Sequence, residues 1–160
     1  MSQYTPQEDA EKTMTGARLR GYAFALLAKR EHSKAELREK LRRYAMNLEE
    51  VDALLQEFEI KNYQSDERYA ELVLSSQINR GKGPRRILQT LHLKEVQSKN
   101  IQEQIKDIDW NEQAYNLKVK KFGTEVSKDP KVLSKQIRFL QYRGYDMDVI
   151  MKVIRRKIEE

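Results

Sequence analysis

An internal repeat of about fifty residues is the feature that most constrains how this chain can fold. Leu41, Leu91 and Leu140 are separated by 50 and 49 residues. Aliphatic residues recur ten and fourteen positions after each of these leucines: Val51, Ile101 and Ile150, then Leu55, Ile105 and Ile154. A recurring register of this kind indicates tandem structural units, each too small to bury its apolar face without a neighbour.

Each round of the repeat has the pattern of three helices. Apolar residues three or four positions apart predict helices, and short polar breaks separate them. The segment from Ser33 to Glu36 has the form of a capping box, and Pro84 and Pro130 suit the first turn of a helix. Further helix starts are predicted at Asn47, Ser65, Asp109 and Asp146. We therefore expect an all-α fold: an elongated, solenoid-like array of three tandem three-helix repeats, each resembling a helix-turn-helix unit.

The repeat also predicts how the chain is divided. Residues 1–16 are polar and are expected to form an N-terminal tail. The three repeats are predicted over residues 17–63, 64–108 and 109–160. The longest uncharged stretches are far shorter than the roughly 18 apolar residues that a membrane-spanning helix needs. We therefore expect a cytoplasmic, monomeric protein without a membrane segment.

Residue types that support catalysis or metal binding are scarce. Cys is absent, which excludes disulfides, thiolate nucleophiles and Cys-ligated metals. The two His residues, His32 and His92, are predicted to be ordinary polar loop residues. The Gly81-Lys82-Gly83 segment lacks the Ser or Thr of a phosphate-binding P-loop and favours a tight turn into a helix. We therefore expect a protein that is not an enzyme and that holds no metal or cofactor.

Charge is unevenly distributed along the chain. The overall net charge is +6, from 31 Lys and Arg against 25 Asp and Glu. Residues 29–43, 80–92 and 118–143 carry local net charges of +4, +4 and +6, whereas residues 49–71 carry −6. Within the repeat, the excess of bases falls around the second helix, so stacked repeats would align these bases as a stripe. Such a stripe suits a polyanion or an acidic protein groove, and a solvated basic face explains it equally well.

Four strings occur in a fixed order along the chain. They are REHSKAEL at 30–37 with KL at 40–41, SDERYA at 65–70, GKGPRRI at 81–87 and RFLQYRGY at 138–145. Together they resemble the RecX family, bacterial regulatory proteins that modulate the RecA recombinase. The resemblance covers about residues 17–158. The second repeat departs from the family pattern because no Gly follows its helix at residues 91–94.

The resemblance implies tandem three-helix units that bind the RecA filament on DNA along its groove. It further implies that the protein limits filament extension and suppresses RecA's ATPase, strand-exchange and coprotease activities, in DNA repair and the SOS response. We predict that the bases of the stripe contact this partner: Lys34, Arg38, Arg42, Arg43, Arg80, Lys82, Arg85, Arg86, Lys135, Arg138 and Arg143. The alternatives are a helical module that binds single- or double-stranded DNA directly, and a passive scaffold for another partner.

Overall fold

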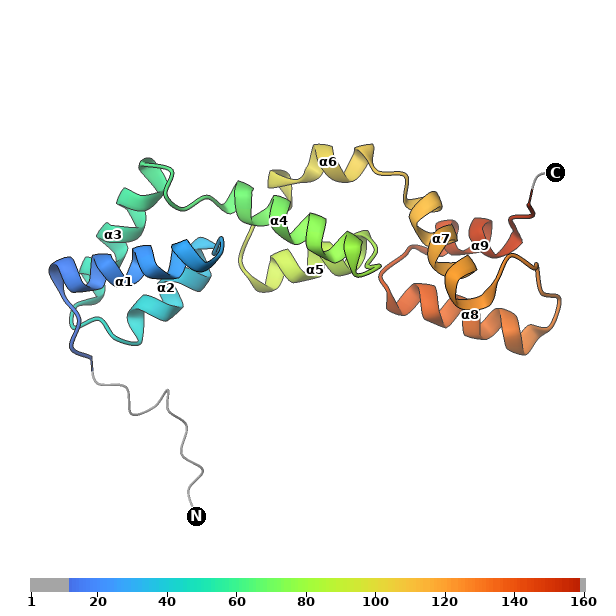
Figure 1. The fold of residues 1–160 in the computed structure, drawn as a ribbon, viewed down its shortest axis with the longest axis horizontal. Coiled ribbons are helices and arrows are strands. Elements are labelled where there is room, and N and C mark those ends of the chain that lie inside the picture. Colours follow the sequence, from blue (N-terminus) through green and yellow to red (C-terminus); the bar gives the residue numbers. More distant parts are fainter. Residues whose placement is uncertain (1–11, 159–160) are drawn as a thin grey trace, which may run out of the picture. The chain divides into compact units, whose positions relative to one another are not determined.

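The computed structural model describes residues 12–158, so residues 1–11 of the predicted tail lie outside the described part. Within that part the chain forms nine α-helices (Figure 1). They are α1 (Gly16–Lys29), α2 (Lys34–Arg42), α3 (Leu48–Ile60), α4 (Asp66–Asn79), α5 (Pro84–Leu93), α6 (Gln102–Asp107), α7 (Trp110–Phe122), α8 (Pro130–Tyr142) and α9 (Met147–Arg155). A short 3₁₀ turn, Ser98–Asn100, precedes α6. The prediction of an all-helical protein made of three-helix domains is confirmed.

The described residues fall into two compact units. Unit 1 comprises the chain up to Ala70 together with Lys94–Val96, and unit 2 comprises Glu71–Leu93 and the chain from Gln97 onward. Helix α4 therefore begins in unit 1 and ends in unit 2.

The core of unit 1 lies between α1, α2 and α3. Leu19, Leu37 and Phe58 are completely buried there, together with Leu41 and Leu55 from the predicted register. Residues at the end of the predicted tail also contact this unit, because the Met14 N–H donates to the Tyr44 carbonyl at 2.8 Å. The Met46 N–H in turn donates to the Met14 carbonyl at 2.9 Å.

The core of unit 2 is built in the same way from α7, α8 and α9. Leu140, Ile150 and Ile154 are buried there, at the positions that correspond to Leu41, Val51 and Leu55 in unit 1. The equivalence that the fifty-residue spacing predicted is therefore a packing equivalence: the same register positions form the core of the first and third repeats.

The predicted helix starts agree with the structure. Ser33 and Glu36 form the reciprocal capping box, and α5 begins at Pro84. The side chains of Asn47, Ser65, Asp109 and Asp129 each accept a hydrogen bond from a backbone N–H in the first turn of the following helix. Asp146 precedes α9 as predicted but makes no capping hydrogen bond. Its carboxylate instead pairs with Arg85, with 2.5 Å between Oδ1 and Nε.

The turn after α5, at the place where the resemblance pointed to a missing Gly, is made by a residue with a side chain. Glu95 has a φ of 56°, in the left-handed region that costs an L-residue about 1 kcal/mol. We expect Glu95→Gly to raise the free energy of unfolding by about 0.5 kcal/mol, since relief of this strain exceeds the added chain entropy. Urea denaturation followed by circular dichroism measures this difference. The control is Gln89→Gly on the exposed side of α5, which should cost about 1 kcal/mol; equal losses in both variants would contradict the prediction.

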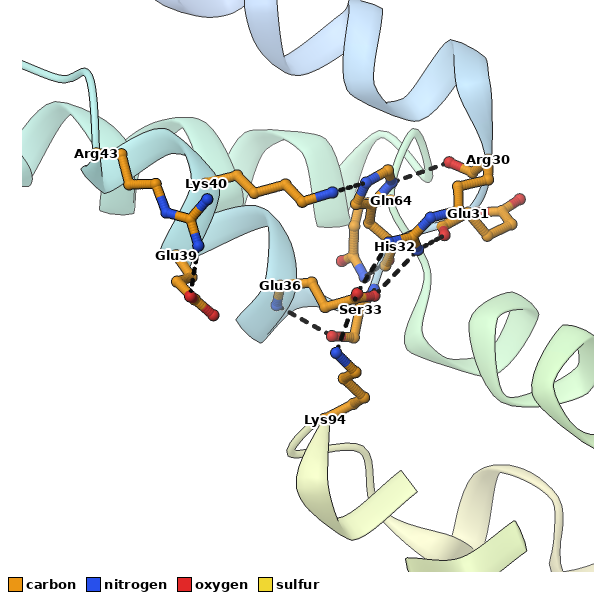
Figure 2. A network of polar contacts seen from close by, with 10 residues as sticks. All are labelled: Arg30, Glu31, His32, Ser33, Glu36, Glu39, Lys40, Arg43, Gln64 and Lys94. Carbon is orange, nitrogen blue, oxygen red and sulfur yellow. Dashed lines mark hydrogen bonds and ion pairs between the residues drawn. The ribbon is translucent and has the colours of Figure 1, made fainter. Parts of the chain in front are cut away.

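His32 is not an ordinary polar loop residue as the sequence predicted. It lies in the loop between α1 and α2, but only 1% of its surface is exposed. Nδ1 is 3.0 Å from the Arg30 carbonyl and Nε2 is 3.0 Å from the Lys40 ammonium (Figure 2). A carbonyl only accepts and an ammonium only donates, so Nδ1 carries the proton and the neutral imidazole is fully hydrogen-bonded. Burial, together with the charges of Arg30 and Lys40, lowers the pKa of His32.

Glu36 is the acidic centre of the same network. Its carboxylate is 9% exposed and accepts hydrogen bonds from the Ser33 N–H at 3.1 Å and from Arg30 at 3.0 Å. The Lys94 ammonium lies 3.5 Å away (Figure 2). Burial alone would raise the pKa of Glu36, but the hydrogen bonds from Arg30 and Ser33 and the positive charges of Arg30 and Lys94 lower it to about 2. The network ties the start of α2 to the segment that follows α5.

Candidate functional site

Most of the predicted bases in unit 1 are neutralised within the unit. Lys34 pairs with Glu59 at 2.8 Å, and Arg42 pairs with Asp52 at 3.7 Å. A third pair, at 2.8 Å, joins Arg43 to Glu39 one turn earlier on α2. Of the four predicted bases on this helix and its C-cap, Arg38 alone forms no ion pair with the described residues.

These ion pairs form because the acidic segment 49–71 packs against the basic segment 29–43. Helix α3 carries most of the acidic residues of segment 49–71, and it packs against α2, which carries the predicted bases. The two local charges of opposite sign therefore face one another across a groove that both helices line. The sequence predicted that the bases of the first repeat belong to a basic stripe, whereas the structure shows a surface on which their charges are largely balanced by carboxylates.

The predicted bases in unit 2 are mostly free of carboxylate partners. Among them, only Arg85 forms an ion pair with another described residue, namely Asp146. Arg143 donates from Nη1 to the Arg80 carbonyl at 2.8 Å. Lys135 and Arg138 are exposed on α8.

Two of these arginines lie on aromatic rings. The Arg86 guanidinium is 5.1 Å from the centre of the Tyr142 ring, and Tyr142 is 70% exposed. The Arg143 guanidinium is 5.1 Å from the centre of the Phe139 ring. A cation held on a ring keeps its full charge, so these arginines are positioned without being neutralised.

The turn before α5 and the turn after α8 meet in a joint between two glycines. The Gly83 N–H donates to the Arg143 carbonyl at 2.6 Å, and the Arg85 N–H donates to the Gly144 carbonyl at 3.1 Å. A Cβ placed on Gly83 would lie 2.6 Å from the Gly144 oxygen. Gly144 has a φ of 97°, and a Cβ there would lie 2.7 Å from the Arg86 nitrogen. We call this contact the glycine joint.

The glycine joint gives a structural role to the glycines in two of the four strings. The string at 81–87 and the string at 138–145 form its two sides. The sequence correctly predicted that Gly81-Lys82-Gly83 is a turn into a helix. It did not reveal that the turn is placed against another one about sixty residues later. This contact brings Arg85, Arg86 and Arg143 together from separate repeats.

Unit 2 carries two further bases near Arg80 and Arg143 that were not among the predicted site residues. Lys120 and Lys121, on α7, line a pocket in unit 2 together with Arg80 and Arg143. The net charge of +6 over residues 118–143 was the signal that pointed to them. Lys118 of the same segment is different, because it is completely buried and donates to the Glu125 carbonyl at 2.9 Å. Burial lowers the pKa of Lys118, and its ammonium is not available to a partner.

Membrane-spanning and metal-binding features are both absent from residues 12–158. No helix in this range is long and apolar enough to cross a membrane. Nor does the range contain a group of three or more His, Cys, Asp or Glu side chains placed to hold a metal ion.

The fold defines a class: all-helical proteins built of three-helix domains. Residues 65–103 match the model of the second three-helix domain of RecX, and residues 107–154 match that of the third. The chain is 58% identical over 147 residues to the regulatory protein RecX of Acinetobacter baylyi, covering 92% of each. It is 36% identical over 138 residues to that of Pseudomonas fluorescens, covering 85% of this chain and 89% of the other. The chain belongs to the RecX family of regulatory proteins, as the four strings predicted.

A solved structure shares the fold. The crystal structure of RecX from Lactobacillus salivarius superposes with a TM-score of 0.74 at 19% identity, covering 86% of this chain and 93% of the other. A second crystal structure, of a regulatory protein RecX, gives a TM-score of 0.69 over 86% of this chain and 72% of the other.

Proposed function

We propose that this chain binds the RecA–DNA filament along its groove and inhibits filament extension, ATP hydrolysis, strand exchange and coprotease activity. It would act as a monomer without catalysis, in the cytoplasm, during DNA repair and the SOS response. The relatives' description as regulatory proteins supports a regulatory role. The observation that carries the proposal is the set of predicted bases in unit 2, of which only Arg85 has a carboxylate partner among the described residues.

Charge balance decides which unit supplies the charged contact. A base that already pairs with a carboxylate gains little from a second acidic partner, whereas an unpaired base attracts one and accelerates the encounter. By this argument the bases of unit 2 contribute more than those of unit 1. Repetition of the three-helix domain also suits a polymeric partner, because several weak contacts made by one chain reinforce one another.

The test uses two exposed bases on α8. We expect Lys135→Glu combined with Arg138→Glu to raise, by about tenfold, the concentration needed for half-inhibition of RecA-catalysed ATP hydrolysis on single-stranded DNA. These positions are preferable to Arg85 and Arg86, because both arginines belong to the glycine joint and their reversal would disturb the fold.

A matched control lies on α9. Lys152→Glu combined with Arg155→Glu reverses an exposed Lys and an exposed Arg at the same spacing in the same unit. This control should inhibit as well as the unaltered protein. Equal inhibition by the two double variants would show that the α8 bases do not contact the filament. If the unaltered protein does not inhibit ATP hydrolysis at stoichiometric concentration, the proposal is wrong.

The same unpaired bases support direct DNA binding as a second candidate function. A DNA-binding module would bind naked single or double strands with a steep dependence on salt, because each neutralised phosphate releases counterions. A filament regulator should bind RecA-coated DNA more tightly than naked DNA at the same salt concentration. Fluorescence anisotropy with labelled DNA, with and without RecA, separates the two functions.

A further inference from the structure

A pocket of about 490 Å³ in unit 2 collects positive charge without an acidic residue among the side chains that line it. Arg80 directly follows α4, Lys120 and Lys121 come from α7, and Arg143 follows α8. The amides of Gln113 and Asn116 also line the pocket. Its volume lies within the range of small-molecule sites in proteins.

Two of the four cations are placed by contacts that leave their charges unneutralised. The Arg143 guanidinium and the Lys121 ammonium lie 5.1 and 5.6 Å from the centre of the same Phe139 ring. Arg143 is fixed further by its hydrogen bond to the Arg80 carbonyl. None of the four cations forms an ion pair with another residue of the described chain. Like charges gathered in this way repel one another, and a bound anion relieves the repulsion.

The turn that borders the pocket is shaped for close approach. Gly81 has a φ of 77°, and a Cβ there would lie 2.8 Å from Leu117 Cδ2 and 3.2 Å from Arg143 Nη1. The absence of a side chain thus allows the turn after α4 to lie close to both Leu117 of α7 and Arg143. The close approach places Arg80, the residue before Gly81, beside Arg143 and α7, whose Lys120 and Lys121 line the same pocket.

We propose that the pocket binds a compact anion with adjacent phosphates, such as the triphosphate of a nucleotide or a free oligophosphate. Four cations exceed what a single carboxylate can neutralise, whereas a triphosphate carries several charges within one small group. Guanidinium groups bind phosphate oxygens in pairs, and the amides of Gln113 and Asn116 add neutral hydrogen bonds. A continuous nucleic-acid strand is less well suited, because it is usually bound along an extended groove with bases stacked on aromatic faces. Here two cations already lie on Phe139.

Binding of such an anion would join α7 and the residues beside the glycine joint. A ligand that binds only the folded state stabilises it, so unit 2 should resist unfolding more strongly when the pocket is filled. Trp110 reports this directly, because it is the one Trp of the chain, lies on α7 and contacts Tyr145.

The experiment is thermal unfolding of the full chain, followed by Trp110 fluorescence. We expect 1 mM tripolyphosphate to raise the Tm by about 4 °C above the value in sodium chloride of equal ionic strength. The combined variant Lys120→Gln, Lys121→Gln should lose this rise. The matched control Lys128→Gln, Lys131→Gln removes two exposed charges from the same unit outside the pocket and should keep it.

Further ligands distinguish the sources of the phosphates. ATP that gives the same rise as tripolyphosphate shows that the phosphates alone are bound, and a larger rise shows that the nucleoside is bound as well; both results support the proposal. An equal rise in the pocket variant and the control variant would overturn it. A rise with an oligothymidylate but none with tripolyphosphate would also overturn it, in favour of a strand. Lys135 and Arg138 are unaltered in these variants, so the result is independent of the filament proposal.

Discussion

Replacing Glu36 with Ala is expected to lower the free energy of unfolding by about 3 kcal/mol. The carboxylate is nearly buried, and it satisfies the Ser33 N–H, pairs with Arg30 and faces Lys94. Its removal leaves a buried N–H without an acceptor and takes the counter-charge away from two cations. Urea denaturation of the full chain, followed by circular dichroism, measures the loss.

Glu39→Ala provides the control on the same helix. Glu39 also pairs with an arginine, Arg43, at 2.8 Å, but its side chain is 70% exposed. Exposed ion pairs of this kind contribute about 0.5 kcal/mol or less. Glu36→Gln should fall between the two Ala variants, because Gln at this position still accepts the Ser33 hydrogen bond but carries no charge. If Glu36→Ala costs no more than Glu39→Ala, the network does not stabilise the unit.

The Glu36 carboxylate also makes the stability of the protein depend on pH, and its contribution should be lost as the pH falls. The pKa of Glu36 falls from an ordinary value of 4.5 to about 2 on folding, so the unfolded chain takes up the proton first as the pH falls. The stability of the unaltered protein relative to Glu36→Gln should therefore be at its full value above about pH 5. It should decline between about pH 4.5 and pH 2. A difference that grows as the pH falls would contradict the assignment.

The features that the sequence predicted well depend on neighbours close in the chain. A cap involves residues two or three positions apart, so Ser33, Asn47, Ser65 and Asp109 could be identified by spacing alone. The register of Leu41 and Leu140 was equally accessible, because a helix presents the same face to its neighbours in each repeat. The fold class followed from these local patterns, whereas the family followed from the resemblance of the four strings.

The features that the sequence did not predict depend on distant partners. Asp146 has the position of a cap, but Arg85, sixty-one residues earlier, takes its carboxylate. His32 has the nearby partners Arg30 and Lys40, but its backbone carbonyl also accepts a hydrogen bond at 3.2 Å from Gln64, thirty-two residues later. The distribution of charge along the chain also did not show that the basic segment 29–43 packs against the acidic helix α3. Local charge identified candidate bases, and only the fold separated the paired from the unpaired ones.

Replacing Gly144 with Ala is expected to have the largest effect in unit 2, a loss of about 4 kcal/mol. Two causes add at this position. The φ of 97° is unfavourable for any side chain, and the new Cβ would lie 2.7 Å from the Arg86 nitrogen and 2.5 Å from its Cγ. The backbone on the other side of the joint is held by two hydrogen bonds and by Pro84, so it has little freedom to move away.

Two single variants in the same unit separate these causes. Gly123→Ala tests the backbone alone, because Gly123 has a φ of 86° but a Cβ added there would have no atom within 4 Å; we expect a loss of about 2 kcal/mol. Gly83→Ala tests the contact alone, since its φ is not positive and its Cβ would meet the Gly144 oxygen at 2.6 Å; we expect about 2 to 3 kcal/mol.

Trp110 fluorescence during urea denaturation measures the stability of all three variants. The centre of the Trp110 ring lies 6.3 Å from that of Tyr145, the residue after Gly144. A loss for Gly144→Ala that exceeds those for Gly83→Ala and Gly123→Ala shows that conformation and contact both matter at the joint. Equal losses for Gly144→Ala and Gly123→Ala would mean that the two turns do not press against each other. The side chains of Arg85, Arg86 and Arg143 would then be held by their own contacts and not by the glycine joint.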